Sequence, residues 1–500
     1  MSRVTQRVNV AFRRRRATSI EINRVCFVLG IMLLVLMVFM FPPAVTDLVA
    51  GHDDWQIFAG SAFVTGFLGL MLVMVTRGSW SEAVSLKEGF LLTVAAWVVI
   101  PLLAAIPFAF LERDLSLADA WFESVSGLTT TGATILTGLD RMSPGILLWR
   151  SITHWIGGVG IVLMALIMLP FLRVGGMQIF QAESSDRSDK FVPRAGEIMG
   201  LLVSTYVIMT LLCGIAYRWA GMSTFDALNH AMSTLSTGGF STHDASLGYY
   251  EQPAIHWVAA AFMFAGSLPL LIFAKMMRTR SLDALRDEQV VGFLKLYASI
   301  VILLTALLVI KTSIEPFDAL RLVAVNVISI MSTTGFALGD YTLWMPGVSG
   351  VFFLLMFLTG CTGSTAGGVK MFRIQIMLLI AGNYIRRLIS PNRVVVAVYN
   401  GKQVTTEIAT AVLAFLAATF VCLMLFTIAL SLYDLDFVTA LSSSATALTN
   451  VGPGLGPTVG PAGNFATLPE GAKALLAVAM LLGRLEYFTV LVVFSRSFWR

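Results

Sequence analysis

The sequence contains little charge. Only 13% of its 500 residues are Asp, Glu, Lys or Arg, whereas 57% are hydrophobic. A soluble domain usually has about a quarter of its residues charged. No polar segment is long enough to form a separate soluble domain, so we expect no enzymatic domain beside the apolar part. The composition predicts one membrane domain with short loops.

Cysteine and histidine are also scarce. The five histidines show no metal-ligand spacing, and the four cysteines are too few and too scattered for a disulfide framework or a zinc site. The net charge of +5 could suggest a nucleic-acid partner, but we expect none, because the placement of charge matters more than its sum in a membrane protein. The cysteines, which we expect to pack between helices, are Cys26, Cys213, Cys361 and Cys422.

Long apolar runs recur from one end of the sequence to the other. A run of 18 or more apolar residues can cross a hydrocarbon core of about 30 Å as a helix. We therefore expect an all-α integral membrane fold with about ten transmembrane helices. The predicted spans are at about 25–48, 56–76, 88–111, 144–172, 196–220, 254–277, 289–311, 347–381, 404–432 and 472–495.

The charges that remain fall on two sides of these spans. Alternating the spans places basic loops on one side and acidic loops on the other, so both termini are predicted to be cytoplasmic. The first apolar run is long and no cleavage site follows it, which predicts a retained helix. The N-terminal arginines are Arg3, Arg7, Arg13, Arg14, Arg15, Arg16 and Arg24, and the predicted outer acids are Asp47, Asp53, Asp54, Glu112, Asp114, Asp119, Glu123, Asp140, Asp226, Asp244, Glu251, Asp340, Asp434 and Asp436.

The outer segments contain a fourfold repeat. Each time, an outgoing span is followed by a moderately apolar stretch that is too short to cross the membrane, and then by an incoming span. Each stretch begins near an aspartate and ends in small residues. Four helix–re-entrant pore loop–helix units imply a pseudo-fourfold pore. The aspartates are Asp119, Asp226, Asp318 and Asp436, and the predicted domains are an N-terminal basic tail with two extra helices (1–80) and four repeats (81–175, 176–280, 281–390 and 391–500).

The small-residue clusters suit a cation site. Irregular backbone at membrane depth is tolerated only where protein covers it or where it lines water. A re-entrant loop with glycine can turn its carbonyl oxygens inward to replace the hydration shell of an ion. The short helices would begin at caps such as Ser223 and Asp434, and their partially negative ends would face the pore. Close packing of helices is the alternative for any single loop, but four loops in equivalent places favour a pore.

A run of small residues at 360–368 interrupts an apolar segment of about 35 residues, where about 20 would suffice to span the membrane. We expect an unwound stretch in mid-membrane that gates the pore; a simple flexible kink is the alternative. The run is not a phosphate loop, because Val369 stands where lysine is required and no Ser or Thr follows Lys370.

One charged residue lies deep in the last predicted span. Arg484 is about twelve residues from each end of that span, and an ionisable residue at such a depth is a functional candidate. Below a cation filter, its charge would act as a barrier or a gate latch. A structural ion pair with Glu486 or with an acid of a short helix is the alternative. Lys370 and Arg373 lie nearer the inner end, and we interpret them mainly as snorkelling anchors.

Together, these motifs resemble the Trk/Ktr/HKT superfamily of potassium transporters. The four loops read Thr-Thr-Thr-Gly, Ser-Thr-Gly-Gly-Phe, Ser-Thr-Thr-Gly-Phe and Thr-Asn-Val-Gly-Pro-Gly, and the third repeat continues with Gly-Ser-Thr-Ala-Gly-Gly-Val-Lys. The resemblance covers essentially the whole chain. Two extra N-terminal helices and Gly483-Arg-Leu-Glu486 make it most similar to the bacterial TrkH/TrkG branch. That branch often has three glycines where this gate has Thr-Ala-Gly-Gly.

The resemblance implies K⁺ uptake across the bacterial cytoplasmic membrane through a gated pore, without enzymatic activity. It also implies a homodimer that docks a cytosolic nucleotide-binding ring of the TrkA type. Glycine at all four filter positions is associated with a preference for K⁺ over Na⁺, and serine at the first position favours Na⁺. The implied filter residues are Thr130, Thr131, Gly132, Thr237, Gly238, Gly239, Thr333, Thr334, Gly335, Asn450, Val451 and Gly452, and the implied gate residues are Gly360, Thr362, Gly363, Ser364, Thr365, Gly367, Gly368, Lys370 and Arg484.

The sequence leaves one alternative mechanism open and disfavours two others. A K⁺/H⁺ or K⁺/Na⁺ symporter with the same pore is the main alternative, although the predicted helices show no obvious deep acidic relay. An inverted-repeat transporter would show paired broken helices in two halves, whereas this repeat is fourfold and points one way. An intramembrane enzyme would need a deep Ser/Lys or Asp/Asp pair or a zinc motif, and we find none in the sequence.

Overall fold

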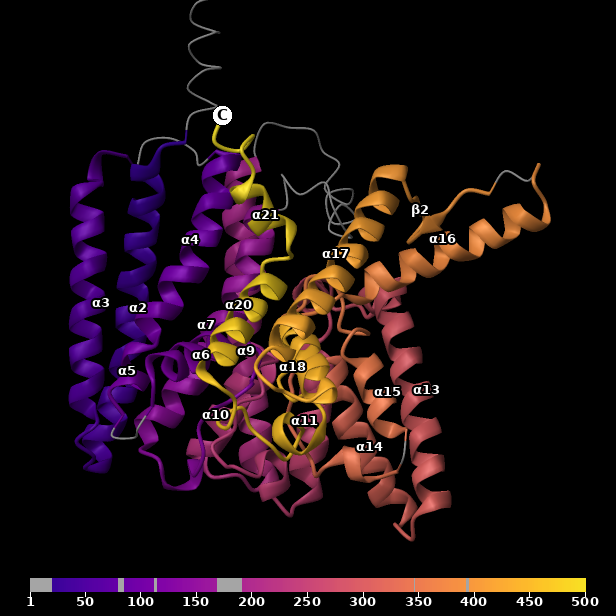
Figure 1. The fold of residues 1–500 in the computed structure, drawn as a ribbon, viewed down its shortest axis with the longest axis horizontal. Helices are drawn as coiled ribbons and strands as arrows, with labels where there is room; N and C mark the ends of the chain where they lie inside the picture. The colour runs from indigo at the N-terminus through magenta and orange to yellow at the C-terminus, as the bar shows by residue number, and fades with distance from the viewer. Residues whose placement is uncertain (1–19, 80–84, 112–114, 169–190, 346, 393–394) are drawn as a thin grey trace, which may run out of the picture.

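The chain folds almost entirely into helices, most of them gathered in one bundle (Figure 1). The computed structural model describes residues 20–79, 85–111, 115–168, 191–345, 347–392 and 395–500. The longer helices are α2 (Ile22–Ala50), α3 (Trp55–Val75), α4 (Leu86–Ala104), α7 (Pro144–Met168), α9 (Phe191–Ala220), α11 (Pro253–Gly266), α13 (Glu288–Lys311), α16 (Met371–Ile389), α17 (Thr406–Ser431) and α20 (Glu470–Arg484).

Shorter elements connect them. The short α-helices are α5 (Ile106–Ala109), α6 (Leu117–Leu128), α10 (Thr224–Leu235), α12 (Leu270–Thr279), α14 (Pro316–Met331), α15 (Val348–Leu355), α18 (Phe437–Thr449), α19 (Gly456–Val459) and α21 (Phe488–Phe494). The described residues also form five 3-10 turns: η1 (Arg77–Ser79), η2 (Leu139–Arg141), η3 (Ser246–Tyr249), η4 (Asp283–Arg286) and η5 (Tyr341–Leu343). An antiparallel hairpin joins β1 (Val398–Tyr399) to β2 (Lys402–Gln403).

Six helices of the described chain are long and apolar enough to cross a membrane, or up to eight spans if each of two bent pairs counts as one. A predominantly helical fold with several spans is therefore confirmed. The total of ten spans stays a prediction, with α7 covering the described part of the span expected at 144–172. The six helices coincide with the spans predicted at about 25–48, 56–76, 88–111, 196–220, 289–311 and 404–432.

Two predicted spans are broken rather than continuous. The span predicted at 254–277 consists of α11 and α12, which meet at 92°, and the span predicted at 472–495 consists of α20 and α21, which meet at 103°. Pro269 stands at the first break, where it has no N–H to continue the helix. At the second break, Glu486 and Tyr487 have positive φ values of 56° and 29°, which a right-handed helix does not contain.

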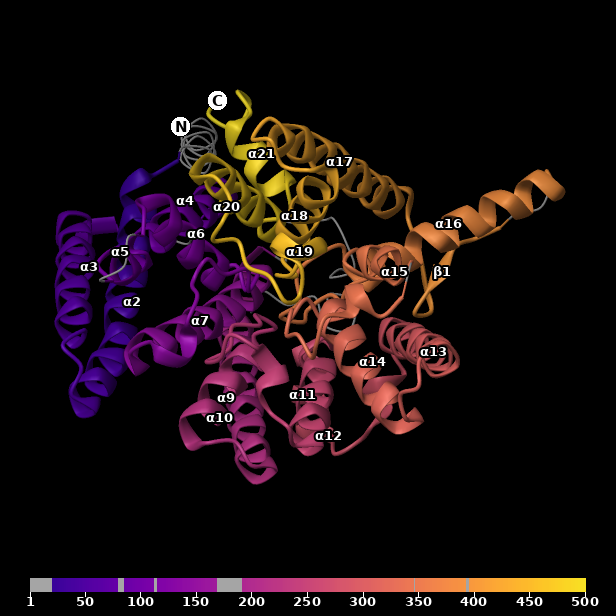
Figure 2. The ribbon, with the colours of Figure 1, turned by 60° about the horizontal axis from the view of Figure 1, so that its bottom comes forward.

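The span predicted at 347–381 also changes direction. Helix α15 ends at Leu355, and residues 356–370 contain no helix. The unwound stretch expected within this span is therefore present. However, α16 does not continue the line of the bundle and projects sideways from it (Figures 1 and 2).

The last helices of the chain pack against helices from its first third. Helix α6 packs against α7 and α20, α10 against α7 and α9, α14 against α11 and α13, and α18 against α17 and α20. An ion pair spans the contact between α20 and α6, where Lys473 Nζ lies 2.6 Å from Asp119 Oδ1. Asp119 is therefore not a free outer acid, because it binds the C-terminal part of the chain to the N-terminal part.

The described chain begins and ends at the same end of the molecule (Figure 1). Of the seven N-terminal arginines, only Arg24 lies among the described residues. Its side chain is buried, and its Nη1 lies 2.9 Å from Glu88 Oε2 on α4. Arg24 thus stabilises the packing of α2 and α4 in addition to contributing positive charge at this end.

Small residues allow α2 and α3 to cross closely. A Cβ built on Gly69 would lie 3.0 Å from the carbonyl oxygen of Gly30 and 3.1 Å from Cβ of Leu33. Close backbone approach through small residues is the usual basis of helix association in membranes, where apolar burial supplies little driving force.

We expect Gly69→Leu to lower the free energy of unfolding by about 1–3 kcal/mol, because the added side chain would overpack this crossing. The matched control is Gly60→Leu on the same helix, where a Cβ meets nothing within 4 Å. Thermal and denaturant unfolding in detergent would measure both variants. Equal destabilisation of the two would contradict the close crossing.

Candidate functional site

Four turns with one backbone pattern follow the four short helices. The first residue of each turn has a φ of 52–59°, and the glycine two positions later has a φ of 80–106°. Glycine adopts this left-handed region without a steric penalty, and asparagine enters it more readily than most other residues. The turns, which contain all the predicted filter residues, are Thr130-Thr131-Gly132, Thr237-Gly238-Gly239, Thr333-Thr334-Gly335 and Asn450-Val451-Gly452.

The same hydrogen bonds end all four short helices. The N–H of the middle residue of each turn donates to the carbonyl oxygen five residues earlier, at 2.9 Å in three turns and 3.1 Å in the fourth. The N–H of the first residue donates to the carbonyl oxygen three residues earlier, at 3.0–3.4 Å. This pattern satisfies carbonyl groups that a helix C-terminus leaves unpaired. The four turns are therefore copies of one local structure.

The starts of the short helices follow the prediction only in part. Ser223 caps α10 as predicted, because its Oγ accepts a hydrogen bond from the N–H of Asp226 at 3.0 Å. The cap predicted at Asp434 is wrong. Asp436 caps α18 instead, accepting from the N–H of Thr439 at 3.0 Å. Asp434 has a φ of 59°, whereas an N-cap residue adopts an extended conformation.

The four turns meet in cyclic order. A Cβ built on the glycine of each turn would overlap the carbonyl oxygen of the middle residue of the next turn. The fourth turn returns to the first, so the contacts form a closed cycle that only glycine permits. The four contacts join Gly132 to Gly238, Gly239 to Thr334, Gly335 to Val451, and Gly452 to Thr131.

This cycle offers oxygen atoms and no ionisable side chain. Its ligands are backbone carbonyls and threonine hydroxyls, and the described part of the chain contains no group of three or more His, Cys, Asp or Glu that could hold a metal ion. Rings of backbone carbonyls suit K⁺, whereas transition metals favour imidazole and thiolate ligands. The C-termini of the four short helices add partial negative charge. The arrangement therefore fits a monovalent cation.

The unwound segment 356–370 packs directly against three of the four turns. Thr365 Oγ1 donates to the carbonyl oxygen of Leu235 at 3.0 Å, where α10 meets the second turn. The N–H of Gly367 donates to Thr333 Oγ1 of the third turn at 2.8 Å. A Cβ on Gly367 would lie 2.7 Å from the carbonyl oxygen of Thr449, beside the fourth turn. The segment thus lies against the cycle itself.

Other predicted gate residues bind the segment to its neighbours. The N–H of Thr362 donates to Gln289 Oε1 on α13 at 2.9 Å. The carbonyl oxygen of Gly363 accepts from the N–H of Leu270 at 3.1 Å, at the break between α11 and α12. Within the segment, Ser364 Oγ donates to the carbonyl oxygen of Cys361, and Lys370 Nζ donates to that of Ala366. The N–H of Met371, the first residue of α16, donates to the carbonyl oxygen of Gly360. Gly368 has a φ of 70°.

Arg484 ends α20 and reaches the same segment. Its Nη1 donates to the carbonyl oxygen of Thr365 at 3.1 Å, and its side chain is buried. Its Nε and Nη2 have no hydrogen-bond partner among the described residues. The alternative of an ion pair between Arg484 and Glu486 is not formed, because Glu486 pairs with Arg373 at 2.8 Å. Arg484 therefore stands at a helix break, not in mid-helix, as a buried charge held by one hydrogen bond.

The interpretation of Arg373 as a snorkelling anchor is wrong. Its side chain is buried, and its guanidinium carbon lies 3.9 Å from the centroid of the Phe415 ring. Lys370 also turns back into the protein, where its Nζ donates to the carbonyl oxygen of Ala366. A contact within the unwound segment thus holds Lys370, and the ion pair with Glu486 and the Phe415 ring hold Arg373.

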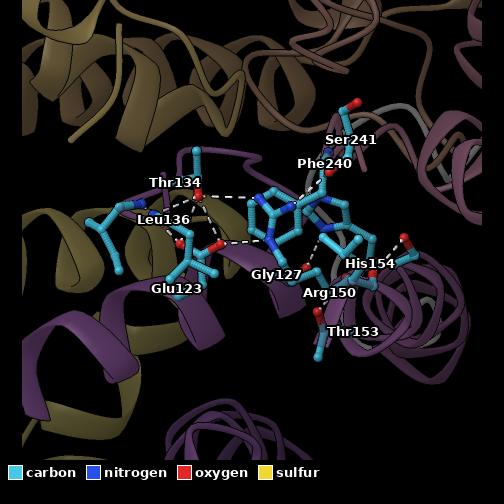
Figure 3. A network of polar contacts seen from close by, with 12 residues as sticks. Glu123, Gly127, Thr134, Leu136, Arg150, Thr153, His154, Phe240 and Ser241 are labelled. Atoms are coloured by element: carbon cyan, nitrogen blue, oxygen red, sulfur yellow. Dashed lines mark hydrogen bonds and ion pairs between the residues drawn. The ribbon is translucent and has the colours of Figure 1, made fainter. Parts of the chain in front are cut away.

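A buried ion pair lies beside the first and second turns (Figure 3). Arg150 Nε lies 2.9 Å from Glu123 Oε1, and both side chains are almost fully buried. Glu123 also accepts from Thr134 Oγ1 at 2.9 Å, and Arg150 Nη1 donates to the carbonyl oxygen of Ser241 at 2.7 Å. The pair joins the residues after the first turn to those after the second. Glu123 is thus a buried structural residue, and its place on the outer side of the membrane stays a prediction.

His154 makes a second connection between these turns (Figure 3). Its Nδ1 lies 2.7 Å from the carbonyl oxygen of Gly127, and its Nε2 accepts from the N–H of Phe240 at 3.1 Å. A carbonyl needs a donor and an N–H needs an acceptor, so the ring is neutral with its proton on Nδ1. Sequence reasoning missed Arg150 and His154. Their signal was an ionisable residue within a predicted span.

A titratable cluster lies outside the spans. His243 Nδ1 is 2.5 Å from Asp140 Oδ1, and its Nε2 is 3.6 Å from Asp226 Oδ1. Burial opposes the charged form of His243, but the attraction of the two carboxylates, one hydrogen-bonded and one nearby, outweighs it and raises the pKa. Burial likewise opposes ionisation of Asp226, but the nearby His243 and a hydrogen bond from Thr242 hold its pKa well below the usual range.

Comparison with known proteins agrees with this chemistry. The family model TrkH, described as a cation transport protein, matches residues 56–500. The Trk system potassium uptake protein TrkI of Halomonas elongata is 44% identical, over 95% of this chain and 96% of that protein. The corresponding protein TrkH of Escherichia coli K12 is 34% identical, over 95% and 98%. The crystal structure of the potassium transporter TrkH from Vibrio parahaemolyticus matches with a TM-score of 0.88 at 30% identity, covering 96% of this chain and 100% of that one.

The fold and these matches define a multi-pass membrane protein of the transport class, not an enzyme. The chain belongs to the TrkH family of cation transport proteins. The family resemblance expected from the loop sequences is confirmed, and it extends over nearly the whole chain.

The cluster around His243 gives a pH prediction. Because its pKa is raised in the folded state, its stabilising contribution is full below the ordinary histidine pKa of about 6.5 and is lost as the pH rises through the raised value. Asp226 also stabilises the fold, but with the opposite pH dependence, because its contribution is lost only as the pH falls through its lowered pKa. Thermal unfolding in detergent should therefore occur at lower temperature as the pH rises past the raised histidine pKa.

His243→Gln should flatten this pH dependence. His52→Gln should keep it, because His52 lies in an exposed loop between α2 and α3. A slope that persists in His243→Gln would show that another group is responsible.

Proposed function

We propose that this protein takes up K⁺ across the bacterial cytoplasmic membrane through a pore lined by its four turns. The observation that carries the proposal is the closed cycle of glycine-to-carbonyl contacts between the turns. Relatives named as Trk system potassium uptake proteins support the identity of the ion. In this proposal the pore repeats occupy residues 81–175, 176–280, 281–390 and 391–500, after an N-terminal part at 1–80.

Backbone carbonyls attract a cation without a fixed acid at the cycle. Carbonyl oxygens replace water around K⁺, and the C-terminal ends of four short helices add to the negative potential. Glu123 contributes little net charge, because Arg150 lies 2.9 Å from it. Its role in the proposal is to fix the turns, together with His154. The filter then selects by the geometry of dipoles held in place.

In the same proposal, residues 360–368 form the gate together with Lys370 and Arg484. Thr365 and Gly367 lie against the turns, and Arg484 binds the carbonyl oxygen of Thr365. A buried positive charge repels an approaching cation strongly, because little water screens it. One hydrogen bond joins Arg484 to the segment. We expect the side chain of Arg484 to move with the segment, so that one movement removes both the segment and the positive charge from the pore.

The proposal includes partners. It takes the protein as a homodimer that docks a cytosolic nucleotide-binding ring of the TrkA type, with both termini in the cytoplasm. The family resemblance supports this, as does the position of both described chain ends at one end of the molecule (Figure 1). The absence of a nucleotide motif from the sequence agrees with nucleotide control through a partner.

Uptake of ⁸⁶Rb⁺ into liposomes tests the transport function. Purified protein should take up ⁸⁶Rb⁺, and K⁺ but not Na⁺ should compete. Gly239→Ala should lower uptake about tenfold or more, because its Cβ would overlap the carbonyl oxygen of Thr334. Gly339→Ala is the matched control, with a φ of 75° and nothing within 4 Å of the added Cβ. An equal loss of uptake in both variants would contradict the proposal that ions pass through the cycle.

Gly132→Ser should lower the K⁺/Na⁺ selectivity. The added side chain would push against the carbonyl oxygen of Gly238 and distort one quarter of the cycle. Reversal potentials under mixed K⁺ and Na⁺ gradients measure the ratio. An unchanged reversal potential in a conducting variant would count against the filter assignment.

Arg484→Ala should raise cation flux, because it removes the positive charge and the hydrogen bond to Thr365. Arg484→Lys keeps the charge and should conduct less than the alanine variant. Size-exclusion chromatography distinguishes the other outcome: an unfolded alanine variant together with a folded, inactive lysine variant would assign Arg484 a structural role.

A further inference from the structure

A cavity of about 580 Å³ opens between α13, α16 and the β1–β2 hairpin. Its wall carries three basic side chains, Arg286, Lys295 and Arg386, and one acidic side chain, Glu288. Three positive charges minus one negative charge leave a net charge of +2. Arg286 forms only an exposed pair with Asp283, at 3.5 Å. The cavity therefore favours an anion.

Two of the bases are available to a ligand. In the part of the chain that the structure describes, neither Lys295 nor Arg386 forms a side-chain hydrogen bond or ion pair. Gln375 is held by two hydrogen bonds in the wall of the cavity. Gln375 Nε2 donates to the carbonyl oxygen of Glu288 at 3.0 Å, and Tyr399 Oη donates to Gln375 Oε1 at 2.5 Å. Lys295 and Arg386 are therefore two cationic groups of the wall that are open to a ligand.

The cavity lies where a membrane span meets a sideways helix. Helix α13 is long and apolar enough to cross a membrane, and Glu288 and Lys295 are in its first two turns. Helix α16 projects from the bundle (Figure 2). Its exposed face combines apolar side chains such as Leu378 and Ile385 with Arg386. A basic amphipathic helix of this kind suits the headgroup region of a bilayer.

We propose that this cavity binds the phosphate headgroup of an anionic phospholipid. Lys295 and Arg386 contact the phosphate, for which the planar guanidinium supplies paired donors. Basic pockets between membrane helices are known to recognise acidic headgroups. The apolar side chains of Leu294 and Leu378, exposed beside the bases, continue the site along the helices and fit an acyl chain. The proposal does not depend on ion conduction.

The test measures thermal unfolding of the full-length protein in detergent with added lipid. Phosphatidylglycerol should raise the unfolding temperature, whereas phosphatidylcholine and inorganic phosphate should not. The double variant Lys295→Gln/Arg386→Gln should weaken the apparent affinity for phosphatidylglycerol about tenfold or more. The control Arg278→Gln/Arg280→Gln removes two exposed charges near the end of α12, outside the cavity, and should bind as the unmodified protein does.

A second variant keeps every charge. Gly382 lines the cavity, and a Cβ there meets nothing within 4 Å, so Gly382→Trp should fill the space and abolish the shift in a folded protein. The proposal is overturned if both lipids act equally, if inorganic phosphate reproduces the shift, if the control loses as much affinity as the cavity variant, or if Gly382→Trp binds normally. A double variant that changes the oligomeric state in lipid-free detergent would assign the cavity to a second copy of the chain instead.

Discussion

The absence of a Cβ atom at four positions is the constraint on which the site depends. Each turn places its glycine against a carbonyl oxygen of the next, so the four turns can close into a cycle only if none of these residues has a side chain. The same need for a residue without a Cβ recurs where two longer helices pack against the short helices. Gly157 on α7 and Gly483 on α20 leave room for the carbonyl oxygens of Leu128 and Leu448, near the ends of two short helices.

Around this cycle, buried polar groups do the positioning that apolar packing alone cannot do in a membrane. Arg150 and His154 join the first turn to the second, and Lys473 with Asp119 joins α20 to α6. Unpaired, such buried charges would cost several kcal/mol each. Arg484 is the exception, since it has one hydrogen bond to the unwound segment and no ion pair in the described chain. That makes it the charge whose surroundings change most if the segment moves.

The sequence predicted the parts of this structure that are determined locally. The glycine-containing turns after the short helices, the cap at Ser223 and the unwound stretch after Leu355 follow from residue types and spacing. It did not predict features that depend on distant segments. The bends at 267–269 and 485–487 lie where other chain segments pack, the sideways course of α16 depends on its start in the unwound segment, and the partner of Glu123 is on another helix. The sequence offered two aspartates as caps of α18. The backbone selects Asp436, which is extended, over Asp434, which has a positive φ.

The central claim is that the cycle of carbonyl oxygens is where the ion binds. X-ray diffraction from crystals grown with Rb⁺, measured at the rubidium absorption edge, tests it most directly. The account predicts an anomalous peak on the axis between the carbonyl oxygens of Thr131, Gly238, Thr334 and Val451, and its loss when Na⁺ replaces Rb⁺. Bound rubidium elsewhere in the protein, with none inside the cycle, would contradict it.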